Sequence, residues 1–391
     1  ESKMKIIIGV ILKQLGEKLD AVREVAGDIL KSLLRSTDPC LDNIPDKPIL
    51  SGCLSTIEKR ISDDYEALIG KNKSSIIKKT SSSSTTTTST TIDKWTQSKY
   101  VYTFLIGALD SNHYFKYILN GLIISVGALS EGIGKESLQA LLHWCHVQKS
   151  SRNLRDLSLL GSVLVEIFQL NAKISRVTLP LMKTFQSLLK NDVFNPILTS
   201  KTSSDSCSLS LGYDLMKCVE NELAKCTEVA KIRTGIDLYI LLLGFNEPVR
   251  SSTWKLLIIL IGHKYPKIRK YVVELLYLQL ISDSNAVGAT LEEILQLKER
   301  NEKIGQVDNN QLIYGLTPNK EVLQKVMDIL TTTVWDDENL EFIREKRKEI
   351  CLFLNLQVNF TEKKNTGKSK SNEKKTDELD SYDSLVREAG Y

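Results

Sequence analysis

The sequence predicts an all-α protein built from irregular helix pairs. Apolar residues recur at the three- and four-residue spacing of amphipathic helices over most of the 391 residues. Segments with the two-residue alternation of half-buried strands are nearly absent, and the eight prolines sit between the apolar segments. At 42% hydrophobic residues, a chain of this length can form two or three compact domains or one extended solenoid.

The first amphipathic helix shows the pattern clearly. In residues 19–34 the apolar positions fall on one helical face, namely Val22, Val25, Ala26, Ile29, Leu30 and Leu33. The prolines between Pro39 and Pro48 end this helix and predict an extended connection. Ser55 and Glu58 have the spacing of a capping box, which predicts that another short helix begins there. Residues 1–69 are therefore interpreted as a helical repeat segment.

A polar insertion follows this segment. Residues 80–91 are twelve consecutive serines and threonines. Side chains of this kind, without an apolar period, cannot offset the entropy lost on ordering, so we predict a disordered insertion over 70–95. It is interpreted as a solvated spacer, with multiple phosphorylation as the alternative.

Helices resume in residues 96–357. Residues 117–129 are apolar on nearly every side and predict a central helix. A Ser-rich linker at 199–210 precedes helical segments at 211–243, 248–262, 266–282, 290–300, 318–333 and 337–355. Thr317-Pro318 and the pair Asp336 and Asp337 are expected to begin the last two. Residues 358–391 are polar and charge-segregated, and predict a flexible tail.

One motif recurs three times, with arginine in the first turn of a helix. The pattern [VI]-R-x-x-[AVT]-x-x-x-L places Arg23, Arg250 and Arg269 at equivalent positions. A cation there opposes the helix dipole, so a compensating group is expected; Asp20 and Glu247 precede the first two arginines by three residues. The third has proline at that position.

The motif is similar to the second helix of HEAT repeats, in which such arginines help to stack neighbouring repeats. It therefore indicates a HEAT/armadillo-like α-solenoid of irregular helix pairs, with Arg23, Arg250 and Arg269 as structural stacking residues. The last two copies are 19 residues apart, about half of a usual HEAT period. We therefore expect irregular repeats.

Composition argues against several classes of function. A net charge of +4, spread thinly, is too small to indicate a nucleic-acid-binding face. The seven cysteines contain no CxxC pair, which indicates reduced thiols in a cytosolic protein. The longest apolar tracts are far shorter than a membrane span, and residues 4–12 do not form a signal sequence. Because Glu1 falls within an expected helix, we interpret the chain as the C-terminal piece of a longer protein.

Candidate chemical sites are weak. His143 and His146 would share a helical face, but two ligands do not make a zinc site, and Cys145 points elsewhere. Residues 130–137 resemble a phosphate loop superficially, yet lack the required residues and are interpreted as a helix–helix turn with glycine at a C-cap. The run 344–349 alternates in sign and is interpreted as a solvated face, or alternatively as a contact for an acidic partner. We predict no catalytic residue, no metal and no cofactor, and therefore not an enzyme.

Several blocks of the sequence together resemble one family. VREVAGDILKSLL with DPCLDNIP, YILNGLIISVGALSE, VTLPLMKTFQSLL, HKYPKIRK, VGATLEEIL and TVWDDENLEFIREKRKEICLFLNL occur in order across residues 1–357. In this order they are similar to the C-terminal region of the tubulin-specific chaperone D family (tubulin folding cofactor D). The stretches 70–95 and 299–320 and the tail after residue 360 depart from that pattern.

The resemblance implies a chaperone role. Proteins of this family take up β-tubulin and join cofactors C and E to assemble or dismantle the α/β-tubulin heterodimer. The complex stimulates GTP hydrolysis by tubulin, so the chain would be at most a GTPase activator, and an Arf-like small GTPase also binds. A cytoplasmic location at the microtubule cytoskeleton follows. The alternative is a generic HEAT-repeat adaptor without tubulin specificity.

Overall fold

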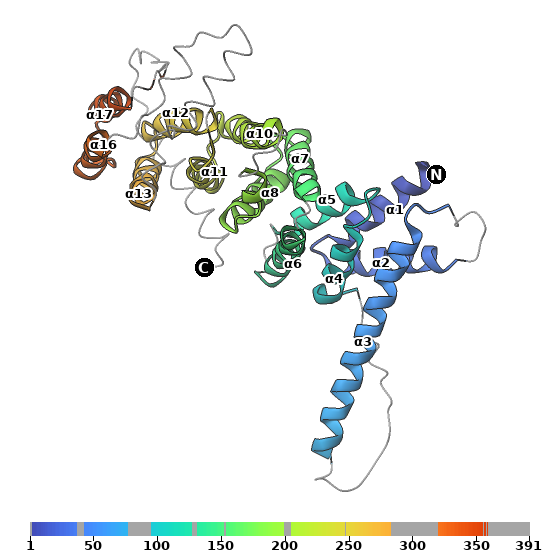
Figure 1. Cartoon of the computed structure of the whole chain (residues 1–391). Helices are drawn as coiled ribbons and strands as arrows, with labels where there is room; N and C mark the ends of the chain where they lie inside the picture. Colours follow the sequence, from blue (N-terminus) through green and yellow to red (C-terminus); the bar gives the residue numbers. More distant parts are fainter. Residues whose placement is uncertain are drawn as a thin grey trace. The chain divides into compact units, whose positions relative to one another are not determined.

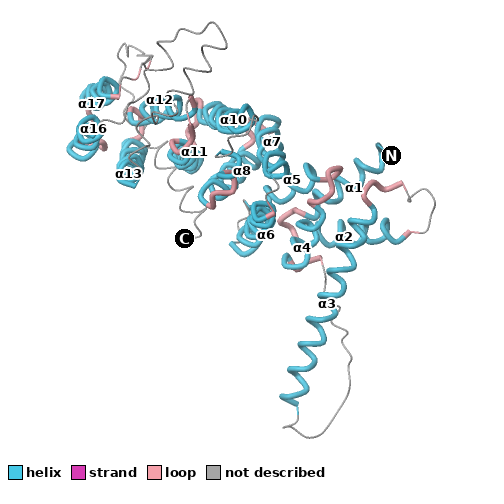
Figure 2. Tube along the Cα trace, in the orientation of Figure 1, coloured by secondary structure: helices cyan, strands magenta, loops and turns pink. Residues whose placement is uncertain are grey.

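The computed structural model is all-α, as predicted. It describes residues 2–36, 43–76, 95–126, 131–151, 154–198, 205–246, 248–282, 320–354, 356 and 358, and these contain helices and connecting turns but no strand. They form two compact units. The first comprises Glu1–Asn153 with Ser175–Thr184, and the second comprises Leu154–Ile174 with Phe185–Tyr391. The ribbon and tube views show the helices of each unit (Figures 1 and 2).

Unit 1 contains two groups of packed helices. Helix α1 (Ser2–Leu15) packs against α2 (Asp20–Arg35) and against α5 (Phe115–Val126). Helix α4 (Ser98–Ala108) packs against α3 (Lys47–Ile76) and against α6 (Glu131–Ser150). Contacts of α5 with α6 and with α4 join the two groups into one core.

Helices α1 and α5 cross at a pair of glycines. A Cβ atom on Gly16 would collide with the backbone of Gly121, and one on Gly121 would collide with the carbonyl oxygen of Lys13. Because neither residue has a side chain, the two backbones can touch. The apolar side chains around the crossing are buried: Ile118, Leu119, Leu122 and Ile123.

Helix α3 corrects one prediction about its own start. It is continuous from Lys47 to Ile76, so Ser55 lies in its interior, and the Ser55 hydroxyl donates to the carbonyl of Ser51 at 3.0 Å. The predicted capping box is therefore wrong. The helix instead begins after Asp46, which has a positive φ of 52°, and Pro48 stands in its first turn. Helix α3 also runs into the range 70–95; residues 77–94 lie outside the described part of the chain.

Unit 2 arranges its helices in two rows (Figure 1). In one row α7 (Leu154–Leu170), α10 (Asp205–Leu223), α12 (Val249–Ile261) and α17 (Leu340–Phe353) pack side by side. In the other row α11 (Val229–Leu242), α13 (Pro266–Ser282) and α16 (Lys320–Thr332) do the same. Consecutive helices cross from row to row, as α10 with α11 and α12 with α13. The arrangement is consistent with an α-solenoid.

Turns in the left-handed region separate several of these helices. Lys225, at φ 61°, breaks the predicted segment 211–243 into α10 and α11, and Lys173, at φ 67°, precedes α8 (Ser175–Lys190). Helix α8 also contains Pro180, so not every proline lies between helices. The short helix α9 (Asn195–Leu198) follows α8.

One other predicted helix start and one predicted turn require correction. The N-cap of α17 is Asn339, whose side-chain oxygen accepts from the backbone N–H groups of Glu341 and Phe342. Asp337 instead accepts from the N–H of Asn339 at 2.8 Å. Helix α6 begins at Glu131, so Gly132 lies in its first turn and not in a helix–helix turn. The predicted helix 290–300 and the Thr317-Pro318 start lie outside the described residues.

Candidate functional site

The three arginines of the recurring motif are all buried. Their exposed fractions are 1% for Arg23, 6% for Arg250 and 1% for Arg269. A charged side chain is rarely buried to this degree unless its hydrogen-bonding groups are satisfied. Their position therefore has to be explained by what the guanidinium groups contact.

Each guanidinium donates to a backbone carbonyl just after the preceding helix. Arg23 Nη1 donates to Glu17 O at 2.9 Å, beyond the end of α1. Arg250 Nε donates to Leu243 O at 3.1 Å, beyond α11, and Arg269 Nη1 donates to His263 O at 2.8 Å, beyond α12. The last carbonyls of a helix lack partners within it, and the dipole favours a cation there. The first turn of one helix thus caps the end of the previous one.

Two of these arginines also reach a distant segment. Arg23 Nη2 donates to Thr96 O at 3.0 Å, next to buried Trp95 and just before α4. Arg269 Nε donates to the carbonyl of Trp335 at 2.7 Å, and its Nη2 donates to Asp337 O at 2.5 Å, just before α17. In both cases one guanidinium joins a helix end to the entry of a helix more than 60 residues later.

Compensation of the arginine charge differs between the copies. Asp20 pairs with Arg23, as the spacing predicts. Glu247, the equivalent residue before Arg250, lies outside the described residues. Arg269 has no acidic residue at that position, and backbone carbonyls accept from it instead, including a longer contact to Lys264 O at 3.4 Å. Stacking of repeats by these three residues remains a prediction that these contacts support.

Sequence reasoning missed the burial of two further cations, Lys231 and Arg347, and Lys231 belongs to an ion pair in unit 2. Lys231 Nζ donates to Glu222 Oε1 at 2.7 Å, and the two side chains are only 5% and 1% exposed. Glu222 Oε2 accepts from the backbone N–H of Lys173 at 2.8 Å. The Lys173 ammonium in turn donates to the carbonyls of Glu222 and Ala224, each at 3.1 Å, at the end of α10. One signal was available, since Lys231 stands between the apolar residues Ala230 and Ile232 in the first turn of α11.

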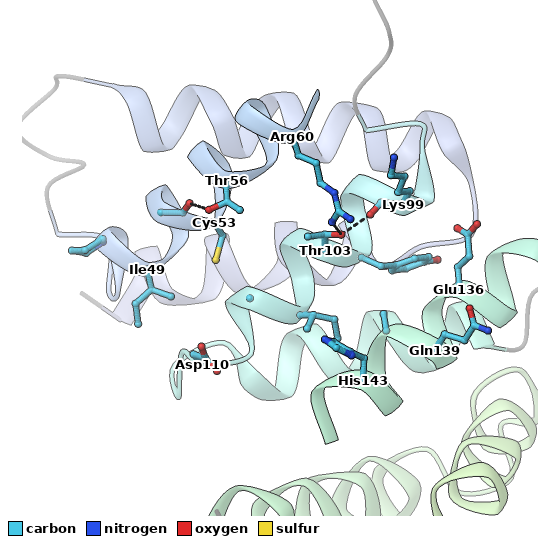
Figure 3. A pocket seen from close by; sticks show the side chains of 16 residues that line it. Ile49, Cys53, Thr56, Arg60, Lys99, Thr103, Asp110, Glu136, Gln139 and His143 are labelled. Atoms are coloured by element: carbon cyan, nitrogen blue, oxygen red, sulfur yellow. Dashed lines mark hydrogen bonds between the residues drawn. The ribbon is translucent and has the colours of Figure 1, made fainter. Parts of the chain in front are cut away.

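Unit 1 has a groove on its surface that could receive a partner. It has a volume of about 930 Å³ and runs along α4, with α3 and α6 as its walls (Figure 3). Its apolar lining combines small residues with larger ones such as Ile49 and Tyr102; the small ones are Gly52, Cys53, Gly107 and Ala140. Apart from His143, which was considered as a weak zinc ligand, no residue of the groove was singled out from the sequence for binding, because its three helices meet only in the folded chain.

Charged residues border this groove. Arg60 Nη1 donates to the Thr103 hydroxyl at 3.3 Å, and Lys99 pairs with Asp64 at 2.6 Å. Figure 3 shows Ile49 and Asp110 toward one end and Lys99 and Glu136 toward the other. Burial, together with the nearby negative charge of Asp110, raises the pKa of the Cys53 thiol. Cys53 therefore stays a neutral thiol and contributes apolar surface.

The residues of the weak metal candidate differ in their exposure. His143 is exposed and lines the groove, whereas Cys145 is fully buried, and burial raises its pKa to about 12. Within the described ranges, no group of three or more His, Cys, Asp or Glu residues could hold a metal ion. None of the helices there is both long and apolar enough to cross a membrane.

Comparison with known proteins decides the family. A family model described as "Tubulin folding cofactor D C terminal" matches residues 5–231, which is more than half of the chain. The chain belongs to the tubulin folding cofactor D family. This confirms the resemblance seen in the sequence, and the whole groove lies within the matched segment.

A curated relative agrees with this assignment. The chain is 21% identical over 347 residues to the tubulin-specific chaperone D of Dictyostelium discoideum. The alignment covers 87% of this chain and 19% of that relative, so the chain spans about a fifth of the relative's length. No solved structure matches the chain.

Proposed function

We propose that this chain acts in tubulin folding by binding β-tubulin and taking part in assembly and disassembly of the α/β-tubulin heterodimer. The observation that carries the proposal is the family match over residues 5–231. The relative in Dictyostelium is named a tubulin-specific chaperone, which makes tubulin the first partner to test.

The partners and location form part of the same proposal. Cofactors C and E would join the chain in a complex that stimulates GTP hydrolysis by tubulin, and an Arf-like small GTPase would bind as well. The chain would act as a GTPase activator only within that complex, because tubulin carries the nucleotide. Its site of action would be the cytoplasm, at the microtubule cytoskeleton.

The architecture is physically suited to holding a client. Helices packed side by side in rows present extended surfaces, and helical-repeat proteins use such surfaces to bind large partners. Such binding requires no catalytic residue in the chain itself. The HEAT/armadillo-like description remains part of the proposal, and the two rows of helices in unit 2 support it. A helical-repeat adaptor without tubulin specificity is the alternative.

Size-exclusion chromatography tests the proposal. The purified chain is mixed with α/β-tubulin at low salt and at physiological salt, and an unrelated acidic protein serves as the control. We expect co-elution with tubulin that survives physiological salt, and none with the control. Co-elution with both proteins at low salt alone would reflect only the net charge of +4. Separate elution at both salts would contradict direct tubulin binding by this chain.

A further inference from the structure

We propose that the outer face of the first helix pair, α1–α2, is an interface for a preceding helix pair of the longer family protein. This outer face consists of Ile6, Ile7 and Val10 on α1 and of Val25 and Ile29 on α2. Such packing follows from the family assignment and does not depend on tubulin binding.

The outer face is apolar and exposed. Its five side chains are between 44% and 59% exposed. Those on α1 lie on the side of the helix opposite to Ile8, Leu12 and Leu15, which are fully buried. Those on α2 lie opposite to the buried Leu30 and Leu34. The pair therefore has one apolar side in the core of unit 1 and a second apolar side that the described residues leave exposed.

The dimensions of the pair define the kind of partner that fits. Helices α1 and α2 pack against each other and are joined by the short turn 16–19, so they run antiparallel. At 1.5 Å per residue they are about 21 Å and 24 Å long. A partner of two helices of similar length would cover the apolar stripes of both, as neighbouring pairs do in helical-repeat proteins.

The last described helix pair, α16–α17, has an outer surface of the opposite character. Most of its exposed positions are polar; they include Gln324, Asp328 and Thr331 on α16 and Glu341, Glu345 and Lys348 on α17. Leu352 and Phe353, in the last turn of α17, are the exceptions. A terminal repeat needs a polar outer face for solubility, whereas a pair inside an array is apolar on both sides. The α1–α2 pair therefore has the surface of an internal pair.

The family match identifies the partner. The matching model describes the C-terminal part of tubulin folding cofactor D, and the chain spans about a fifth of the Dictyostelium relative's length. A protein of this family therefore has a large region before the part that is matched here. A helix pair joined to α1 by a short connection has an effective concentration on the order of millimolar. It would therefore occupy the outer face in preference to a second copy or a separate client.

The accessibility of a thiol in two forms of the protein tests the interface. The Ile7→Cys variant is made in this 391-residue chain and in the full-length protein, and peptide mass spectrometry follows maleimide labelling at position 7. We expect labelling to be at least tenfold slower in the full-length protein, because the preceding pair covers this position. Val147→Cys is the matched control. Val147 is 50% exposed on α6, outside the outer face, so its labelling rate should be equal in the two forms.

Charged variants test the same contact in trans. The preceding region is supplied as a separate polypeptide of about 90 residues, two usual HEAT periods, and calorimetry measures its binding to the chain. Ile7→Glu and Val25→Glu should each weaken binding more than tenfold, and Val147→Glu should leave it unchanged. Because all three side chains are exposed in the chain alone, no variant should lower its melting temperature by more than about 2 °C.

Several results would overturn the proposal. A gene in which no helical region precedes residue 1 would do so, as would equal labelling at position 7 in the two forms. Self-association of the chain that Ile7→Glu abolishes would assign the outer face to a second copy. Protection of position 7 by added tubulin, with fast labelling in the full-length protein alone, would assign it to the client. Labelling decides the matter where the separate region fails to bind.

Discussion

The buried Glu222–Lys231 pair allows the sharpest stability prediction. Lys231 Nζ lies 2.7 Å from Glu222 Oε1, and the side chains of Glu222 and Lys231 are 1% and 5% exposed. Removing one partner of such a pair leaves an uncompensated buried charge, which costs about 3–5 kcal/mol in general. Lys231→Met would leave the Glu222 carboxylate with the Lys173 N–H, so we expect a loss of about 3–4 kcal/mol in the free energy of unfolding.

The reverse change should cost less. Glu222→Gln keeps an oxygen that can accept from Lys173, and Glu228 remains 3.6 Å from the Lys231 ammonium. We therefore expect a loss of about 2–3 kcal/mol. The double variant Glu222→Gln with Lys231→Met buries no charge at this site. It should be more stable than the sum of the two single losses implies, by about 2 kcal/mol or more.

Urea unfolding and hydrogen exchange measure these effects. Because the chain has two compact units, exchange of the amides in α10 and α11 reports on the affected unit directly. The exposed pair Lys217–Glu220 on the same helix is the matched control, and Lys217→Met should cost less than about 1 kcal/mol. Single losses below 1 kcal/mol at both Glu222 and Lys231, with additive effects, would refute the reasoning.

Three further predictions concern other buried groups. Gly121→Ala should lower stability by about 1–3 kcal/mol in urea unfolding, because its Cβ collides with α1, and a value below about 0.5 kcal/mol would contradict the crossing. Burial lowers the pKa of His263 to about 4, with the charges of Lys264 and Arg269 adding to the effect. As the pH falls, His263 is therefore protonated at a higher pH in the unfolded chain than in the folded chain. Stability should therefore fall as the pH falls from about 6.5 to 4, by up to about 3 kcal/mol, and a His263→Gln variant that keeps the same acid sensitivity would refute this cause. Arg269→Lys keeps the positive charge but loses the planar donors of the guanidinium, so the amides near Trp335 should exchange faster with solvent. Unchanged protection of these amides would contradict a stabilising contact between Arg269 and the Trp335 carbonyl.

The helical character of the chain could be predicted because it depends on local patterns. The apolar spacing in 19–34 corresponds to α2, although Val25 and Ile29 of the predicted apolar face are exposed. The largely apolar segment from residue 117 to residue 126 corresponds to α5, most of whose apolar side chains are buried. The recurring motif also drew attention to three arginines that prove to be buried. In each case a few neighbouring residues carry the information.

Features that depend on distant residues could not be predicted. Ser55 has the sequence of a helix start, yet α3 is continuous through it. The carbonyls that accept from Arg269 lie 66 and 68 residues away, and no local pattern connects them. The groove likewise combines three helices that are separated in sequence, so no local sequence pattern indicates which residues line it.

Direct binding to tubulin is the central claim, and sedimentation velocity tests it most directly. The 44.0 kDa chain is titrated with α/β-tubulin at physiological salt, alone and with cofactors C and E. We expect a saturable complex with one chain per heterodimer. Absence of a complex between this chain and tubulin in the mixture without cofactors would contradict direct binding, and its absence with both cofactors present would contradict the whole account.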